Sequence, residues 1–404
     1  MTTTEHDSTA PLDWLIPTPC ECCAARKRRW RRVRRWSLIL FAPVLAVALT
    51  IGLILQPTPP DLSVPPGSQP FTWTADTQPY GITLSGLQNY VLSYKLMVTM
   101  KHQIKAAAAS WYANTIRLQI LQDRMVGIYG QRYNAPYMYA VIRLTRYAES
   151  FGMHVVLNAQ TEQSTGWDQD EQQPTQATIA FWDRMTQEFG RDRRVIFDLF
   201  NEPRHCSWQQ WLDGFVARDG THYIGIQTLV NHVRYVGAHN TIWLEGLRWA
   251  STLEGVPMVH EPGGYPTLVY TFHHPGSTTQ RVAPASKQIW YEIGGYLAKR
   301  GIPVVDAEFP GYIGNYHWDH ASGLVPTYFK WLRRLHIGLL AWSLVPGALN
   351  STLAYNSCTN EPQGDGCLMR NYFREQAIPR HDKYLPRYRI HHRHRTQKHF
   401  VKAA

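Results

Sequence analysis

The segment VIFDLFNEP (Val195–Pro203) places a carboxyl group directly after a short apolar run. A second segment, VVDAEFPG (Val304–Gly311), repeats this arrangement further along the chain. Short apolar runs that are bounded by turn-forming residues predict buried β-strands. Glu202 and Glu308 therefore stand at the ends of two predicted strands, where folds with parallel strands carry their reactive groups.

Outward from these two segments, six further apolar runs have the length and composition of strands. The eight predicted strands begin near Tyr80, Asn114, His154, Val195, Thr241, Thr267, Pro303 and Gly338. Stretches long enough for helices lie between them, at 93–110, 135–151, 175–190, 224–237, 284–300 and 324–336. This alternation predicts an α/β fold, a (β/α)8 or TIM barrel. The alternative is an open doubly wound sheet, which usually has a Gly-rich loop after its first strand; Leu84–Leu87 is not such a loop.

The two strand-end glutamates suit the hydrolysis of a glycosidic bond. One carboxyl group donates a proton to the leaving oxygen, and the other attacks the anomeric carbon or activates a water molecule. A single glutamate at a strand end is common, but a pair on the fourth and seventh of eight predicted strands is a far more specific pattern. Glu202 and Glu308 are therefore expected to face one another at the mouth of the barrel.

Over Tyr80–Gly347 the chain resembles glycoside hydrolase family 5, the cellulase family of (β/α)8 barrels with catalytic glutamates on strands 4 and 7. The likeness rests on motifs in the order GITLSG, NTIRLQI, NEP, VYTFHHP, DAEFPG and LLAWS. The resemblance implies a retaining mechanism, with Glu202 as the acid/base and Glu308 as the nucleophile. It also implies substrate-binding roles for Arg117, Asn201, His273 and Trp342.

These implied roles carry physical expectations. Glu202 has to be protonated before the reaction, so burial among apolar groups should raise its pKa. Glu308 has to be ionised, and Arg117 beside it would favour the charged form. Asn201 can hydrogen-bond a sugar hydroxyl next to the reacting carbon, and Trp342 can form a platform under the sugar ring.

The chain departs from the family pattern at two strand ends. The family often has a histidine at the end of strand 3, where this sequence has Gln160, a candidate substrate-binding residue. The tyrosine that usually follows two residues after His273 is replaced by Pro275. His274 lies between them and is a candidate substitute for the group that orients the nucleophile.

Plainer roles remain open for the supporting residues. Arg117 could form a structural ion pair, His273 could be a hydrogen-bonded core residue, and Trp342 could pack against its neighbours. Three more residues follow predicted strands, namely Glu162, Glu245 and Trp249. Surface or structural roles are favoured for the two glutamates, and the tryptophan is a candidate second sugar platform.

The sequence predicts five segments: a cytoplasmic basic stretch (1–36), a transmembrane helix (37–55), a proline-rich linker (56–72), the barrel domain (73–378) and a basic, histidine-rich tail (379–404). The span carries no charge and is long enough to cross a bilayer as a helix. Eight basic residues between Arg26 and Arg35 precede it, so the barrel is expected outside the cell membrane. Cleavage of a signal peptide after Ala48 is the alternative, but the apolar run continues to Leu55.

Charge and cysteine content limit the remaining classes. The formal net charge of +11 arises at the two ends of the chain, so a nucleic-acid partner is not predicted. Nothing in the sequence requires a metal or another cofactor. Cys358 and Cys367 flank a short loop and are candidates for a disulfide in an oxidising compartment. Cys206 is expected to be a buried thiol.

Taken together, the residue patterns predict a glycoside hydrolase outside the membrane, and the family resemblance implies that it is retaining and cleaves β-glycosidic bonds of a glucan or a related polysaccharide. The alternative is a catalytically weak or inactive barrel, anchored in the membrane, that binds carbohydrate. Gln160 and Pro275 mildly favour this alternative, whereas the complete pair of glutamates favours activity. A third reading is a membrane anchor whose barrel binds no sugar.

Overall fold

We analysed the protein through a computed structural model. It describes residues 78–88, 92–127, 133–160, 173–262, 268–273, 287–309, 312–313, 316–317, 324–346, 353–355 and 366–377. Structural statements below refer to these residues.

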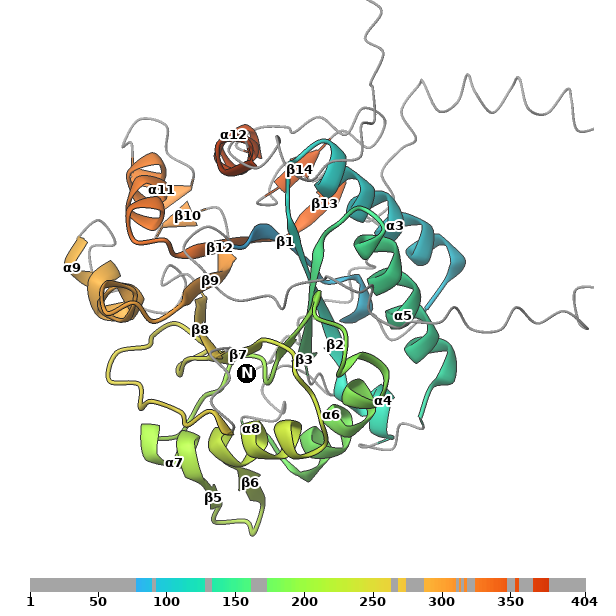
Figure 1. Cartoon of the computed structure of the whole chain (residues 1–404), viewed down its shortest axis with the longest axis vertical. Helices are drawn as coiled ribbons and strands as arrows, with labels where there is room; N and C mark the ends of the chain where they lie inside the picture. The colour runs from blue at the N-terminus through green and yellow to red at the C-terminus, as the bar shows by residue number, and fades with distance from the viewer. Residues whose placement is uncertain are drawn as a thin grey trace, which may run out of the picture.

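Eight parallel strands close into a barrel in the order β1-β12-β9-β8-β7-β4-β3-β2 (Figure 1). Their bounds are β1 Tyr80–Leu84, β2 Thr115–Leu121, β3 His154–Gln160, β4 Val195–Asp198, β7 Ile242–Glu245, β8 Leu268–His273, β9 Val304–Phe309 and β12 Gly338–Trp342. The ring is closed because β1 pairs with β2 on one side and with β12 on the other. Closure leaves no free sheet edge.

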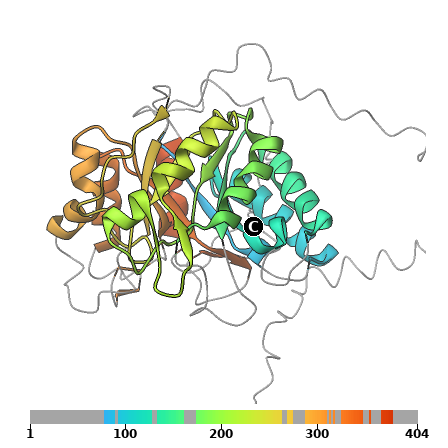
Figure 2. The ribbon, with the colours of Figure 1, turned by 90° about the horizontal axis from the view of Figure 1, so that it is seen from below.

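Helices surround the strands, and Figure 2 shows them from a second direction. The α-helices are α3 Tyr94–Ala109, α4 Gln122–Val126, α5 Ala135–Glu149, α6 Gln176–Phe189, α7 Trp208–Asp213, α8 Ile226–Tyr235, α9 Lys287–Trp290, α10 Tyr296–Lys299, α11 Leu324–Arg334 and α12 Gly366–Ala377. A 3-10 turn (Gly86–Gln88) follows β1, and a π-helical turn (Tyr291–Gly295) joins α9 to α10. Three two-stranded sheets decorate the barrel: β5 Gly214–Val216 with β6 His222–Ile224, β10 Tyr312–Ile313 with β11 Tyr316–His317, and β13 Leu344–Pro346 with β14 Leu353–Tyr355.

Local sequence explains where several helices begin. The hydroxyl of Ser93 accepts a hydrogen bond from the backbone N–H of Leu96 at the start of α3. Thr175 forms a capping box at the start of α6, and Asn134 caps α5. Such residues satisfy backbone N–H groups that have no partner within the helix.

Two apolar regions pack against the strands. The larger core fills the space between the strands and the surrounding helices. The smaller one, which we call the inner apolar layer, lies on the barrel strands themselves and consists of Val156, Ile196, Trp243, Val269, Val305, Ala307 and Leu340. All seven side chains are fully buried. Every strand of the barrel is therefore covered by apolar groups, as expected for parallel strands.

The predicted barrel is confirmed, and each of its eight strands begins within one residue of its expected position. The helix expected at 284–300 is interrupted by the π-helical turn, and the small sheets, α4, α7 and α12 were not predicted. None of the helices in the described ranges is long and apolar enough to cross a membrane. The predicted span at 37–55 and the tail from residue 379 lie outside the described residues.

Candidate active site

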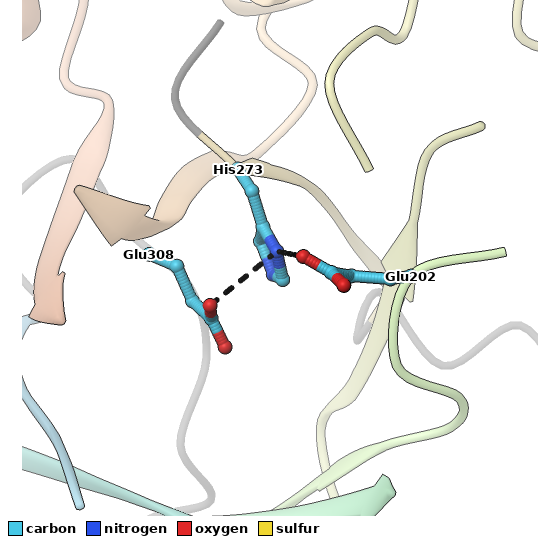
Figure 3. Close-up of side chains that lie close together, drawn as sticks. All are labelled: Glu202, His273 and Glu308. Carbon is cyan, nitrogen blue, oxygen red and sulfur yellow. Dashed lines mark hydrogen bonds and ion pairs between the residues drawn. The ribbon is translucent and has the colours of Figure 1, made fainter. Parts of the chain in front are cut away.

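Glu202 and Glu308 lie at the same end of the barrel. Glu202 is in the turn after β4, and Glu308 is the penultimate residue of β9. His273, the last residue of β8, lies between the two carboxyl groups (Figure 3). The structure thus brings together the two glutamates and the histidine that the sequence singled out.

The distances within this trio are short. Nδ1 of His273 lies 2.9 Å from Oε1 of Glu202 and 3.7 Å from Oε2 of Glu308. One oxygen of each carboxyl group and one ring nitrogen all lie within 4.8 Å of one another. This set of donor atoms could hold a divalent cation, but hydrolysis by a pair of carboxyl groups has no need of one.

A β-bulge directs Glu308 toward the trio. Phe272 on β8 pairs with Asp306 on β9, whereas the next residue, His273, pairs with Glu308. β9 therefore has one extra residue, Ala307, and its pairing with β12 shifts over the same stretch. Ala307 belongs to the inner apolar layer, so strict alternation would point Glu308 away from the barrel interior. The bulge removes this conflict between packing and chemistry.

Arg117 on β2 is fully buried and joins the ends of three other strands. Its Nε donates to Asp198 at 2.7 Å, and its Nη2 donates to Asn201 at 2.9 Å and to Glu245 at 2.7 Å. Its Nη1 donates to Oε1 of Glu308. Burial disfavours the charge, but the surrounding carboxylates outweigh it and raise the pKa of Arg117. The guanidinium is thus a fixed positive charge beside Glu308.

Glu308 has a second donor in Gln119, whose Nε2 lies 2.7 Å from Oε1. Burial raises the pKa of Glu308 above its ordinary value, although the charges of His273 and Arg117 act against this and two nearby glutamates add to it. The net direction is opposite to the expectation from Arg117 alone. The reason is that desolvation and neighbouring carboxylates outweigh the cations at this position.

Glu245, the last residue of β7, is buried among these groups. The sequence favoured a surface or structural role for it, and burial excludes the surface role. Its Oε2 accepts the backbone N–H of Glu202 at 2.6 Å and lies 3.4 Å from Nε2 of His273. Burial disfavours its charge, but His273, Arg117 and the N–H of Glu202 outweigh burial and lower the pKa of Glu245 to about 2. The groups around it therefore favour its ionised form.

We call this assembly the polar cluster: Arg117, Gln119, Asp198, Asn201, Glu202, Glu245, His273 and Glu308. Sequence reasoning missed Asp198 and Gln119 as members. Both interrupt otherwise apolar strands, in VIFDLF and IRLQI, and this interruption was the available signal. Burial and the charge of Glu245 raise the pKa of Asp198 well above its ordinary value, while Arg117 acts in the opposite direction.

Of the positions at which the sequence departs from the family pattern, the structure describes Gln160 but not His274 or Pro275. Gln160 ends β3 and is buried, and its Oε1 has no hydrogen-bond partner among the described residues. It makes no hydrogen bond with either catalytic candidate in that part of the chain. Glu162, His274 and Pro275 lie outside the described residues, so their expected roles stay predictions.

Two tryptophans expected to contact sugar are exposed near the strand ends. Trp342 ends β12, and Trp249 lies in the loop after β7; each is 40% exposed. Trp249 and both its neighbours have positive φ angles. This loop is held on one side by a hydrogen bond from the N–H of Trp249 to the carbonyl of Pro203, and on the other by one from the N–H of His273 to the carbonyl of Ala250. The position of Trp249 is thereby tied to the turn that carries Glu202.

Cys206 and Cys367, the two cysteines that the structure describes, do not take part in the site. Cys367 is exposed and forms no disulfide with another described residue, while its predicted partner Cys358 lies outside the described residues. That disulfide stays a prediction. Cys206 is half-buried, and burial raises the pKa of its thiol to about 12, so it is an unreactive thiol.

A family model described as Cellulase (glycosyl hydrolase family 5) matches residues 74–347. Among curated proteins, a manganese dependent endoglucanase from Phanerodontia chrysosporium is 30% identical over 129 residues, which are 27% of this chain and 31% of that protein. The chain thus spans about a third of the length of this relative.

Solved structures resemble the fold over nearly their full length. An endo-beta-1,4-glucanase from Xanthomonas axonopodis pv. citri has a TM-score of 0.53 at 16% identity, covering 74% of this chain and 99% of that one. A beta-glucanase from Saccharophagus degradans in complex with cellotetraose has a TM-score of 0.54 at 20% identity, covering 74% and 88%. At such identities the likeness concerns the fold.

Proposed function

The chain belongs to glycosyl hydrolase family 5, the cellulase family of enzymes that act on O-glycosyl compounds, and on this premise we propose that it is a retaining endo-β-glucanase. The observation that carries the proposal is the close approach of Glu202 and Glu308, which have one oxygen each within 4.8 Å. Retaining glycosidases hold their carboxyl groups about 5–5.5 Å apart, whereas inverting enzymes leave about 6.5–9.5 Å for a water molecule.

In the proposed mechanism, Glu308 attacks the anomeric carbon of the bound sugar. Arg117 and Gln119 both donate to Oε1 of Glu308, which leaves Oε2 as the attacking atom. Glu202 gives its proton to the leaving oxygen as the bond breaks. The product is a glycosyl ester of Glu308. Glu202 then removes a proton from water, which attacks the same carbon and releases the sugar.

His273 assists both halves of this cycle. Its Nδ1 lies within hydrogen-bonding distance of Glu202 and close to Glu308, and the carboxylates of Glu308 and Glu245 raise its pKa well above the ordinary value despite burial. A positive charge here offsets the negative charge that the carboxylates bring to one small volume. Asn201 is held by Arg117 on the same side and is a candidate for contact with a sugar hydroxyl.

The proposed substrate is a β-1,4-linked glucan. The names of the similar proteins support this choice, since two of them are endoglucanases and a third is a beta-glucanase solved with cellotetraose. The partial exposure of Trp342 and Trp249 supports it further, because flat aromatic rings stack on the apolar faces of glucose units.

Proton NMR of the first product tests the mechanism. Two successive displacements at one carbon give net retention, so the β-anomer should appear first from a β-1,4-glucan, before mutarotation mixes the signals. An α-anomer appearing first would show that Glu308 activates water instead of attacking. Lack of turnover on a panel of β-glucans, with sugar binding retained, would favour the inactive carbohydrate-binding barrel.

We further propose that the apolar run at 37–55 anchors the barrel outside the cell membrane. The basic residues that precede this run support a cytoplasmic N-terminus. Protease added to intact cells should then cut the barrel but spare an epitope at residue 1. A secreted product that begins near Leu49 would identify the segment as a signal peptide.

A further inference from the structure

Glu245 uses both of its carboxylate oxygens inside the polar cluster. Oε1 accepts from Nη2 of Arg117 at 2.7 Å, and the amide of Asn158 lies 3.4 Å from the same atom. Oε2 accepts from the backbone N–H of Glu202 at 2.6 Å and faces Nε2 of His273 at 3.4 Å. One side chain thus contacts the backbone that carries one catalytic glutamate and the cation that contacts the other.

The backbone of Glu202 needs such a contact. Its φ angle is +53°, a left-handed conformation that is uncommon for any residue with a side chain. The next residue is Pro203, and proline steers the residue before it toward extended conformations. A conformation disfavoured on both counts persists only where the surroundings hold it. Glu245 holds this conformation by accepting a hydrogen bond from the backbone N–H of Glu202.

We propose that Glu245 is a positioning residue that fixes the left-handed turn at Glu202 and thereby aims the acid/base carboxyl at the scissile bond. The inference rests on the proposed function, since it assigns Glu202 the acid/base role. Glu245 touches no reacting atom. It acts through the peptide group of Glu202 and, on its other side, through Arg117.

A glutamine cannot replace Glu245 in this role. Its one carbonyl oxygen could accept from Arg117 or from the N–H of Glu202, but not from both. Whichever contact the oxygen keeps, the NH₂ group meets a second donor at the other, and the turn at Glu202 is pushed from its place. Aspartate keeps both acceptor atoms and the charge, so Glu245→Asp should retain part of the function.

The test compares two substrates that differ in their need for acid assistance. A nitrophenyl β-cellobioside has a good leaving group and needs little, whereas cellotetraose needs it fully. In Glu245→Gln, kcat/KM on cellotetraose should fall about ten- to a hundredfold further than kcat/KM on the aryl glycoside. The ratio kcat/KM is compared because it reports the first step, whereas the later attack of water needs Glu202 as base with both substrates. Glu245→Asp should lie between this variant and the wild type on cellotetraose.

Asp198→Asn is the matched control. Asp198 is as buried as Glu245 and also binds Arg117, but it has no contact with the N–H of Glu202 among the described residues. A purely structural or electrostatic effect transmitted through Arg117 should lower the rates on both substrates by the same factor. The control should therefore lack the substrate-dependent loss expected of Glu245→Gln.

Three results decide the matter. Equal losses on both substrates in Glu245→Gln, or rates close to the wild type, would overturn the inference. If Glu245→Gln does not fold, as judged by circular dichroism, Glu245→Asp decides: a selective loss on cellotetraose supports the role, and any other pattern overturns it. Glu202→Ala is measured in parallel, because the absence of a selective loss there would refute the acid role of Glu202 itself rather than the positioning role of Glu245.

Discussion

The inner apolar layer and the polar cluster are built on the same strands. On β4, Ile196 belongs to the layer and Asp198 to the cluster; on β7, the corresponding pair is Trp243 and Glu245. The members of each pair are two positions apart in the sequence, and side chains at this spacing point to the same face of a strand. On each of these strands, the inward-facing side chain nearer the strand start packs in the apolar layer, and the next one on the same face belongs to the polar cluster.

The comparison teaches that the two regions depend on each other. The layer fills the barrel beneath the cluster with side chains that carry no hydrogen-bonding group apart from the indole N–H of Trp243. Charges above such a surface interact strongly, because little water screens them. The layer and the cluster thus occupy different positions along the same strands. Substitutions in the layer should change the free energy of unfolding, and substitutions in the cluster should change kcat.

The largest effect is expected from Glu308→Gln, which removes the nucleophile from the cluster while leaving the layer intact. Turnover should fall by at least about 10⁴-fold, as for other residues that act in covalent catalysis. Calorimetry should still detect binding of cellotetraose, and the melting temperature should not fall. Near-normal hydrolysis by this variant would show that Glu308 is not the nucleophile.

Glu202→Ala should have the next largest effect, and an effect that depends on the substrate. Hydrolysis of cellotetraose should slow by about 10²- to 10⁴-fold, the usual contribution of general acid catalysis. Aryl glycosides with good leaving groups should be much less affected in their first step. Stopped-flow measurement of nitrophenolate release, beside steady-state assays, separates the two.

Ile196→Ala tests the other region. Removing a fully buried side chain from the layer should lower the free energy of unfolding by about 2–5 kcal/mol. At temperatures where the variant is folded, kcat should stay close to the wild type, since no member of the cluster is altered. Denaturant titration and cellotetraose assays on the same sample check both statements. A large loss of kcat in the folded variant would show that the regions are not separable.

The smallest effect concerns the acid limb of the pH–rate profile. Glu308 must be ionised to attack, so activity is lost as pH falls through its pKa. Because burial raises that pKa above the ordinary value of 4.5, the limb of kcat/KM for an aryl glycoside should lie above pH 4.5. Ile196→Ala should keep the same limb. A limb below pH 4.5 would mean that the cations Arg117 and His273 outweigh burial.

The barrel was predictable because its strands are continuous apolar runs that alternate with helical stretches. A nearly continuous apolar run indicates a strand that is buried on both faces, as the strands of a parallel barrel are. The two glutamates to which we assign catalysis could be singled out for a related reason: Glu202 and Glu308 stand at or near the ends of such runs, in segments that resemble family motifs.

The role of Glu245 could not be read in the same way. WLEG has the same form as the other strand ends, but nothing in it reveals that its carboxylate accepts the N–H of Glu202, a contact across 43 residues. The bulge at Ala307 is equally hidden, because nothing in VVDAEF marks Ala307 as an extra residue. Both features depend on pairing between distant segments.

The contacts of Arg117 have a consequence for the assembly of the barrel. Arg117 lies on β2, whereas two of its carboxylate partners, Glu245 and Glu308, lie on β7 and β9. A chain folded only as far as β4 would hold this guanidinium with Asp198 alone among its carboxylate partners. A barrel closed with the wrong strand order or register would leave these charges buried without partners. Burying unpaired charges costs more free energy than mispacking apolar side chains. The carboxylate partners of Arg117 are therefore complete only when β7 and β9 have taken their places in the barrel, so the closed fold and the site depend on the same strands.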